Sequence, residues 1–478
     1  MTKEPQRSPA AQAELRTRAR PTVAWLAVLA GACISMAAHA ASTADSARLS
    51  DSFTPVGAER AANKDGTIPA WAPERQDTPA WTWGKLRLNH WKYQADKPLY
   101  SVDATNADKH ADRLSPGQLA LIKQTKGYRM DVYPTRRSCG VPDFVAENTK
   151  RNVGFAKIAT DGSSLQDAYV PGIPFPMPES GVEAMVNMML RYRGVASEFK
   201  DGATLVSPRK GSSEWINYGY DQTLFWPWAA KGSRKLSEVG YTRSHVYFGY
   251  TSPVALAGQA AVITDFFDKP GSETFYYFPG QRRVRRLPAY AYDAPQIGFE
   301  GQYAMDETQV FMGPLDRFDW KLMGKREMLV PYNAFGAYDF SGKQQEIAQR
   351  DFIDPLHRRY EMHRVWVVQA SVKGGARHMA PKRTFYLDED SWNAVLAEDY
   401  DGQGNLWKVR EGFLIPLFET GTCDVAAFAQ YNLAEGRYLF DFHAAGTGTD
   451  ARWYTEPAGP KMRANFYTSD SLRALSER

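Results

Sequence analysis

The residues with the clearest potential for catalysis are three pairs of neighbouring carboxylates. These pairs are Asp316 with Asp319, Asp388 with Asp390, and Glu398 with Asp399. Two carboxylates that face one sugar beside aromatic side chains form the machinery of a glycoside hydrolase. Each pair lies beside a predicted turn, however, and acids at turns are most often solvated. We therefore interpret all six as surface residues, with a glycan-acting enzyme as the alternative.

Histidines and nucleotide-binding motifs give no stronger indication of chemistry. His357 and His363 are six positions apart in a predicted strand region, a spacing that does not direct both side chains at one zinc ion. The sequence has no Gly-x-Ser-x-Gly elbow, phosphate loop or dinucleotide fingerprint. We predict that the protein is not an enzyme, that it has no catalytic residues, and that it needs neither a metal nor a cofactor.

The strongest charge feature is a basic run at residues 281–287, which holds four arginines. In a strand, Arg283 and Arg285 would share one face, so they are our candidates for binding an anionic group or a protein partner. The alternative is a solvated edge strand whose arginines oppose aggregation. The formal net charge is +4, and five basic and two acidic residues lie in the first 40 positions. The rest of the chain is thus nearly neutral, which argues against a nucleic-acid partner.

Aromatic side chains make up 13% of the chain, more than one face of a sheet needs for its core. Strands that are apolar on both faces require a second layer, a partner or a ligand. The residues that we predict to contact a ligand are Tyr247, Phe248, Phe266, Tyr276, Phe278, Trp320 and Trp366. Met185 and Met189, on a predicted helix over 182–193, join them because methionine packs against irregular shapes. That helix is either a movable lid or an ordinary core helix.

The first forty residues have the order of a secretory signal peptide. Basic residues precede a short apolar run over 23–34 and the small-x-small site Ala38-His39-Ala40. The run is shorter than the roughly 20 residues of a membrane-spanning helix. We predict a cleaved signal and export to the periplasm. Cys33 would leave with the signal, and we predict that Cys139 and Cys423 form a disulfide in that oxidising compartment. Two buried thiols are the alternative.

The predicted elements that must position these residues are mostly strands. Helices are predicted over 54–62, 117–125, 142–152 and 182–193, and residues 41–110 read as an irregular wrap. Strands are predicted over 241–250, 260–268, 273–278, 308–312, 319–330, 359–372, 383–387, 393–400, 406–415 and 437–442. This pattern predicts a mainly β fold with one large, strongly curved antiparallel sheet or barrel. A membrane-spanning β-barrel is the alternative, opposed by the helices and coil of the first 200 residues.

Several motifs resemble those of a bacterial exported family of unknown function. The opening motif runs from Thr54-Pro55-Val56-Gly57-Ala58-Glu59 to Asp65-Gly66-Thr67-Ile68-Pro69-Ala70-Trp71. Later motifs lie at 282–292, 315–321, 330–333 and 385–392. The family is related to the outer-membrane lipoprotein-sorting proteins LolA and LolB. The resemblance covers nearly all of the chain after residue 40.

The resemblance implies an open part-barrel, with helices on the concave face of the sheet around a hydrophobic cavity. It also implies a carrier for a lipid-like or sterol-like molecule or an acyl chain, and a gene often placed beside RND-type exporters. We therefore expect a signal peptide over 1–40 and a single domain over 41–478, with wrap and helices to residue 200 and mostly strands after it. The alternative function is a non-catalytic envelope scaffold that binds an exporter or an outer-membrane protein.

Overall fold

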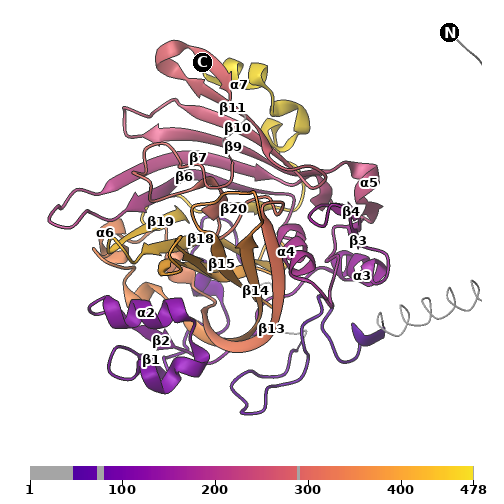
Figure 1. Ribbon diagram of the computed structural model, residues 1–478, viewed down its shortest axis with the longest axis vertical. Helices are drawn as coiled ribbons and strands as arrows, with labels where there is room; N and C mark the ends of the chain where they lie inside the picture. Colours follow the sequence, from indigo (N-terminus) through magenta and orange to yellow (C-terminus); the bar gives the residue numbers. More distant parts are fainter. Residues whose placement is uncertain (1–46, 73–79, 288–290, 477–478) are drawn as a thin grey trace, which may run out of the picture. The chain divides into compact units, whose positions relative to one another are not determined.

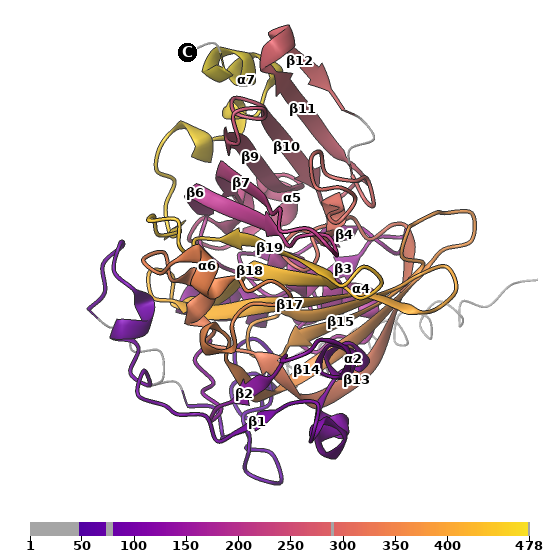
Figure 2. The same cartoon turned by 90° about the vertical axis from the view of Figure 1, so that its left-hand side faces the viewer.

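Sixteen strands of the computed structural model join into one curved sheet (Figures 1 and 2). The structure describes residues 47–72, 80–287 and 291–476, so the predicted signal peptide lies outside the described residues. The sheet is mainly antiparallel, with one parallel contact between Tyr360 and Val132. It stays open, because β1 stands at one end of the strand order and β12 at the other. The prediction of a mainly β fold with an open curved sheet is confirmed.

The strands follow the order β1-β2-β14-β15-β16-β17-β18-β19-β6-β7-β9-β10-β11-β12, with β13 beside β14 and β20 beside β6. Their bounds are β1 (Tyr100–Val102), β2 (Met130–Val132), β6 (Ala196–Val206), β7 (Ile216–Phe225), β9 (Thr242–Ser252), β10 (Ala260–Phe266), β11 (Ser272–Phe278), β12 (Arg283–Arg286), β13 (Phe318–Pro331), β14 (Tyr360–Val372), β15 (Lys382–Asp388), β16 (Ala394–Tyr400), β17 (Leu406–Leu417), β18 (Thr422–Asn432), β19 (Arg437–His443) and β20 (Arg452–Tyr454). Two small sheets pair β3 (Lys157–Ile158) with β4 (Leu165–Asp167) and β5 (Tyr169–Val170) with β8 (Arg234–Lys235).

The helices are short and begin where the sequence places their caps. They are α2 (Pro116–Gln124), α3 (Asp143–Asn152), α4 (Gly181–Leu190), α5 (Leu236–Val239), α6 (Gln344–Ile347) and α7 (Ser469–Ser476). Ser115 with Gln118 and Ser180 with Glu183 form reciprocal capping boxes at the starts of α2 and α4. None of the helices in the described ranges is long and apolar enough to cross a membrane.

Both faces of the sheet are covered. Helix α4 lies inside the curve, against β13 and β14, whereas α7 packs against β10, β11 and β12 (Figure 1). Residues 47–72 and 80–99 are mostly irregular, as predicted for the wrap, and they contact distant parts of the chain, such as Glu389 through the N–H of Glu59 and Asp450 through Arg87. Because both faces are covered, even Arg364 in the alternating stretch of β14 is only 6% exposed.

Two predicted elements are wrong, and three long strands and several short ones were not predicted. Residues 54–62 form turns instead of a helix: the Thr54 side chain accepts a hydrogen bond from the Ala58 N–H, but the chain does not continue as a helix. Residues 308–312 are irregular because Gln309 and Val310 both have positive φ. Strands β6, β7 and β18 are additional, whereas the hairpin turn at 401–404 joins β16 to β17 as predicted.

Candidate functional site

An apolar pocket lies between the inner, concave face of the sheet and an irregular stretch of chain that crosses it. We call this stretch, residues 291–316, the cover segment. The pocket encloses about 620 Å3, counted with the solvent-open part of its mouth. The strands contribute mainly Tyr220, Val246, Phe248, Ala261, Ile263 and Tyr276, and the cover segment contributes Phe299, Tyr303, Met305 and Met312. Its mainly apolar lining, with a few polar groups, is that of a site for a small apolar molecule.

The register of three neighbouring strands brings the aromatic residues of the pocket together. Ala261 of β10 pairs with Phe248 of β9 on one side and with Tyr276 of β11 on the other. Directly paired residues point to the same face of a sheet, so the small Ala261 leaves a gap between two rings. That gap forms part of the pocket.

The floor of the pocket is polar at one point. Asp441 of β19 accepts hydrogen bonds from the hydroxyls of Tyr220 (3.1 Å), Tyr303 and Thr204. Burial raises the pKa of Asp441, although these hydroxyls act in the opposite direction. Gln222 also lines the pocket, and its buried Oε1 has no hydrogen-bond partner among the described residues. The pocket can therefore hold an apolar body and accept a hydrogen bond from it.

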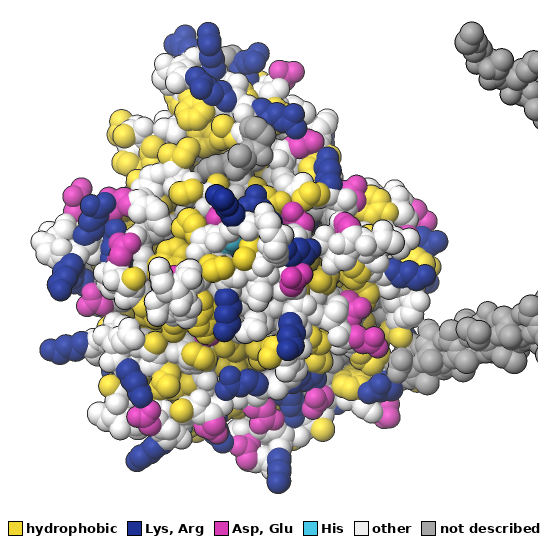
Figure 3. All heavy atoms as spheres, in the orientation of Figure 1, with side chains coloured by type: hydrophobic (Ala, Val, Ile, Leu, Met, Phe, Trp, Pro, Cys, Tyr) yellow, Lys and Arg dark blue, Asp and Glu magenta, His cyan; other side chains and the backbone are white. Residues whose placement is uncertain are grey.

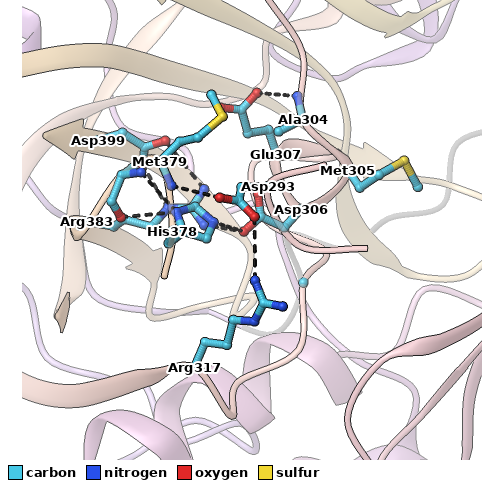
Figure 4. A network of polar contacts seen from close by, with 12 residues as sticks. Asp293, Ala304, Met305, Asp306, Glu307, Arg317, His378, Met379, Arg383 and Asp399 are labelled. Carbon is cyan, nitrogen blue, oxygen red and sulfur yellow. Dashed lines mark hydrogen bonds and ion pairs between the residues drawn. The ribbon is translucent and has the colours of Figure 1, made fainter. Parts of the chain in front are cut away.

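A buried network of ion pairs holds the cover segment on the sheet (Figure 4). Asp306 bonds Arg383 of β15 at 2.5 Å and His378 at 3.0 Å, and Arg383 continues to Asp399 of β16 at 2.9 Å. One residue along, Glu307 bonds Lys408 of β17 at 2.7 Å. Burial alone would raise the pKa of Asp306, but Arg383 and His378 hold it below its usual range. The cover segment is therefore fixed by charge as well as by apolar packing.

The structure brings only some of the predicted ligand-contacting residues to this pocket. Phe248 and Tyr276 line it, and Phe278 stacks on Tyr276 with ring centroids 4.6 Å apart. Met189 and Phe266 line a separate pocket of about 380 Å3 between α4 and the end of β10.

The remaining predicted residues lie elsewhere. Tyr247 is on the opposite face of β9, with Lys461 over its ring at 3.8 Å. Met185 is in the core, Trp320 packs against Phe385, and Trp366 stacks on Trp392. Ligand contact by any of the predicted residues stays a prediction.

Arg283 and Arg285 are exposed on β12, at the free end of the sheet. They pair with Phe278 and Tyr276, so they share the inner face with the pocket. Figure 3 shows Lys and Arg side chains gathered above an apolar area near this end of the sheet. This arrangement is compatible with both interpretations made from the sequence, an anion-binding rim and a solvated edge.

The predicted disulfide between Cys139 and Cys423 is confirmed. It joins the segment before α3 to β18 across 284 residues of sequence. The Tyr332 hydroxyl lies 2.9 Å from the Cys139 Sγ.

The interpretation of the carboxylate pairs as solvated turn residues is wrong for four of the six. Asp388, Asp390, Glu398 and Asp399 are at most 2% exposed, whereas Asp316 is half-buried and Asp319 is exposed. The buried acids have structural partners that are distant in sequence. Arg137 binds both oxygens of Asp390, and the backbone N–H of Gly117 donates to Glu398.

His363 is buried as well, and it lies with Asp388 and Asp390 so that their possible ligand atoms are within 4.8 Å of one another. A guanidinium already occupies one carboxylate of this group, because Arg137 donates to both oxygens of Asp390 at 2.8 and 2.7 Å. Burial and the neighbouring Asp390 raise the pKa of Asp388. We interpret the group as part of an ion-pair cluster, and the absence of a metal stays a prediction.

Sequence reasoning missed the cover segment, which supplies six of the seventeen residues that line the pocket. Its residues show neither helical nor strand periodicity, and the segment was read partly as the strand 308–312. The pairing of Asp306 and Glu307 with basic residues on β15 and β17 leaves no local pattern. The aromatic and methionine residues between 299 and 312 were the available signal.

The fold and the pocket define a class of curved-sheet protein with an apolar pocket under a covering segment. A family model described as "Protein of unknown function (DUF1329)" matches residues 101–473. A relative, the uncharacterized protein PA3922 of Pseudomonas aeruginosa, is 36% identical over 421 residues, which are 86% of this chain and 90% of the relative. The chain therefore belongs to the DUF1329 family.

Two solved structures are similar over 61% of this chain. One is a domain from Vibrio parahaemolyticus named as an outer membrane lipoprotein-sorting protein, with 14% identity, 98% of that chain covered and a TM-score of 0.41. The other is a DUF1329 family protein from Desulfovibrio piger, with 12% identity, 97% of that chain covered and a TM-score of 0.40.

Proposed function

We propose that the protein is a periplasmic carrier that binds a hydrophobic ligand beneath the cover segment. The ligand is a lipid-like or sterol-like molecule or the acyl chain of a lipoprotein. The apolar pocket between the sheet and the cover segment is the single observation that carries this proposal. The predicted signal peptide and the resemblance to an exported family support the periplasmic location.

The lining of the pocket suits reversible binding. Each buried 100 Å2 of apolar ligand surface contributes about 2.5 kcal/mol, at about 25 cal/mol per Å2. The costs of association are subtracted from this gain, so the net affinity stays low enough for the ligand to dissociate. A carrier needs an affinity that is limited in this way, because the ligand must also leave.

A pocket-filling variant tests the proposal. Ala261→Phe places a ring between Phe248 and Tyr276, and we expect it to reduce uptake of a fluorescent fatty acid at least tenfold. Ala255→Phe, at an exposed position in the β9–β10 loop, is the matched control and should bind like the wild type. Protein from its native host should also release an apolar molecule that mass spectrometry detects. Equal uptake by both variants, together with no extracted lipid, would refute the carrier function.

A second candidate function is the envelope scaffold, in which the protein binds an exporter of the RND type or an outer-membrane protein. It is favoured by Leu88 and Leu356, which are 41% and 79% exposed and line a pocket between the wrap and the β13–β14 connection. A stable complex that survives Ala261→Phe but not Leu356→Asp would favour the scaffold over the carrier.

A further inference from the structure

Two buried arginines share one carboxylate inside the curve of the sheet. Arg191 and Arg193 directly follow α4, and their side chains are 6% and 7% exposed. Each donates a hydrogen bond to the same atom, Oδ1 of Asp424 on β18, at 3.3 and 3.2 Å. The second oxygen of Asp424 accepts from the indole N–H of Trp453 at 3.1 Å.

This cluster carries an excess positive charge. No second carboxylate of the described residues lies within ion-pairing distance of either guanidinium. The nearby Arg243 has its own partner, Asp265, at 3.4 Å. An uncompensated charge away from water costs several kcal/mol. Burial and the neighbouring Arg193 accordingly lower the pKa of Arg191 to about 9.

The same cluster has hydrogen-bond donors that are not used. The Nε of Arg191 and the Nε2 of Gln309 are buried and have no partner among the described residues. A buried water could accept from such donors, but it could not neutralise the charge. An anionic oxygen accepts these hydrogen bonds and also neutralises the charge. It forms stronger hydrogen bonds with guanidinium than a neutral acceptor does.

A neutral side chain of the cover segment now occupies part of this position. The amide Oε1 of Gln309 accepts from Arg193 at 3.2 Å. Gln309 and the next residue, Val310, have φ of 49° and 70°, and a β-branched residue is strained in the left-handed region. Such strain persists only where the surroundings impose it, and it gathers at ligand sites.

The cover segment also connects the arginines to the apolar pocket. Thr308 and Met312, on either side of Gln309, line that pocket. A displacement of the segment would therefore open the pocket and uncover the arginines together. A ligand with an apolar body and one acidic group could then fill the pocket with its body and pair its acidic group with the arginines.

We propose that Arg191 and Arg193 bind the acidic group, a carboxylate or a phosphate ester, of an amphiphile whose apolar part lies under the cover segment. This inference rests on the proposed carrier function and narrows its ligand class. It places the acidic group on the buried pair and not on the exposed Arg283 and Arg285. The acidic group takes the place of Gln309 Oε1 and balances the charge that Asp424 leaves uncompensated.

The test compares palmitate with hexadecanol, which has the same chain length and no charge. We expect the wild type to bind palmitate at least tenfold more tightly. Arg191→Met should remove this preference by weakening palmitate binding far more than hexadecanol binding, and Arg191→Lys should keep part of the preference. Arg283→Met is the matched control at an exposed arginine and should keep all of it. Loss of the preference in Arg283→Met alone would overturn the assignment to the buried pair.

A second measurement separates ligand binding from a structural role. Without ligand, Arg191→Met should unfold at the same or a higher temperature than the wild type, because it removes the excess charge. If Arg191→Met instead unfolds at a much lower temperature and still prefers palmitate, Arg191 has a structural role and the proposal is overturned.

Three further outcomes of the test are decisive. Equal binding of palmitate and hexadecanol by the wild type would overturn this inference and leave the carrier function standing. If the wild type binds neither palmitate nor hexadecanol, this inference and the carrier function are both refuted. If inorganic phosphate alone stabilises the protein and palmitate is not preferred, Arg191 and Arg193 bind a free anion, and the proposal of an amphiphilic ligand is overturned.

Discussion

Asp306 and Arg383 are 77 positions apart in the sequence, and a 2.5 Å ion pair joins their side chains beneath the cover segment. Both residues are at most 2% exposed. Arg383 lies on β15, which has a paired strand on each side, whereas Asp306 lies in a segment with little regular structure of its own. The pair therefore determines where the cover segment sits, and with it the shape of the apolar pocket.

Asp306→Asn should loosen the cover segment. The amide removes the charge that Arg383 and His378 face, so we expect a stability loss of about 3 kcal/mol, as for one lost partner of a buried pair. Hydrogen exchange of residues 291–316 should accelerate more than exchange of β15. Asp293→Asn is the control, because Asp293 is partly exposed and its ion pair with Arg317 is 3.5 Å long. Equal acceleration by the two variants would contradict a specific role of Asp306.

A buried histidine should make the fold sensitive to acid. His245 stacks on Tyr467 with ring centroids 4.4 Å apart, and burial lowers its pKa to about 4. In the unfolded chain its pKa is about 6.5, so between pH 6.5 and 4 the unfolded state takes up a proton that the folded state does not. Stability contributed by the neutral His245 is therefore present above pH 6.5 and is lost as the pH falls to 4.

The His245→Asn variant isolates this effect, because asparagine can keep the contact of Nδ1 with Thr264 without titrating. The wild type should lose on the order of 3 kcal/mol more than the variant between pH 7 and pH 4. Urea unfolding at several pH values measures the difference. His90→Asn, at a half-buried position in the wrap, should show the pH dependence of the wild type. Parallel stability curves for wild type and His245→Asn would rule out the effect.

Most of the long strands were predictable because β-branched and aromatic residues mark them locally. Strands β13 and β14 pair over most of their length, and the sequence carries that signal in each of them. Strand β18 was missed since its Ala-rich sequence has no alternation, and all eleven of its residues are buried. Strand β6 was missed because Lys200-Asp201-Gly202 reads as a turn, whereas the structure uses it as an irregularity within the strand.

The candidate site was less predictable, because its parts are joined by contacts between distant residues. The excess of aromatic residues in β9 and β11 predicted a ligand-contacting surface there, but it did not separate Phe248 on the inner face from Tyr247 on the opposite face. The buried state of Asp399 depends on Arg383 and Arg410, and that of Asp424 on Arg191 and Arg193. A single sequence shows each acid beside its own neighbours and not beside its partner.

Reduction of the disulfide should destabilise the fold. Cys139 and Cys423 close a loop with a sequence separation of 284, and the loop-entropy model assigns such a bond roughly 4–5 kcal/mol. We expect the denatured, unreduced chain without residues 1–40 to contain no reactive thiol. A reductant should lower the unfolding temperature. The Cys139→Ala/Cys423→Ala variant should unfold at the temperature of the reduced wild type and not respond to reductant. Two titratable thiols in the unreduced protein would exclude the bond.

Arg137 should be the residue whose loss releases the wrap. Its side chain is fully buried, and it donates to both oxygens of Asp390 and to the carbonyl of Glu59 in the wrap. Although burial disfavours its charge, Asp390 and Glu389 raise the pKa of Arg137. Arg137→Met leaves these acids buried beside one fewer cation, so we expect a stability loss of about 3–5 kcal/mol.

The accompanying loss of the bond to Glu59 should expose residues 54–71 to limited proteolysis before the sheet unfolds. Arg113→Met is the matched control, because Arg113 pairs with Asp65 of the same segment at 33% side-chain exposure. An exposed pair of this kind contributes less than about 1 kcal/mol. The rate of cleavage of Arg137→Lys should lie between the rates of Arg137→Met and Arg113→Met. Lysine keeps the charge but cannot donate to Asp390 and Glu59 in the same fork geometry. Equal cleavage of Arg137→Met and Arg113→Met would show that the wrap is held by its apolar contacts instead.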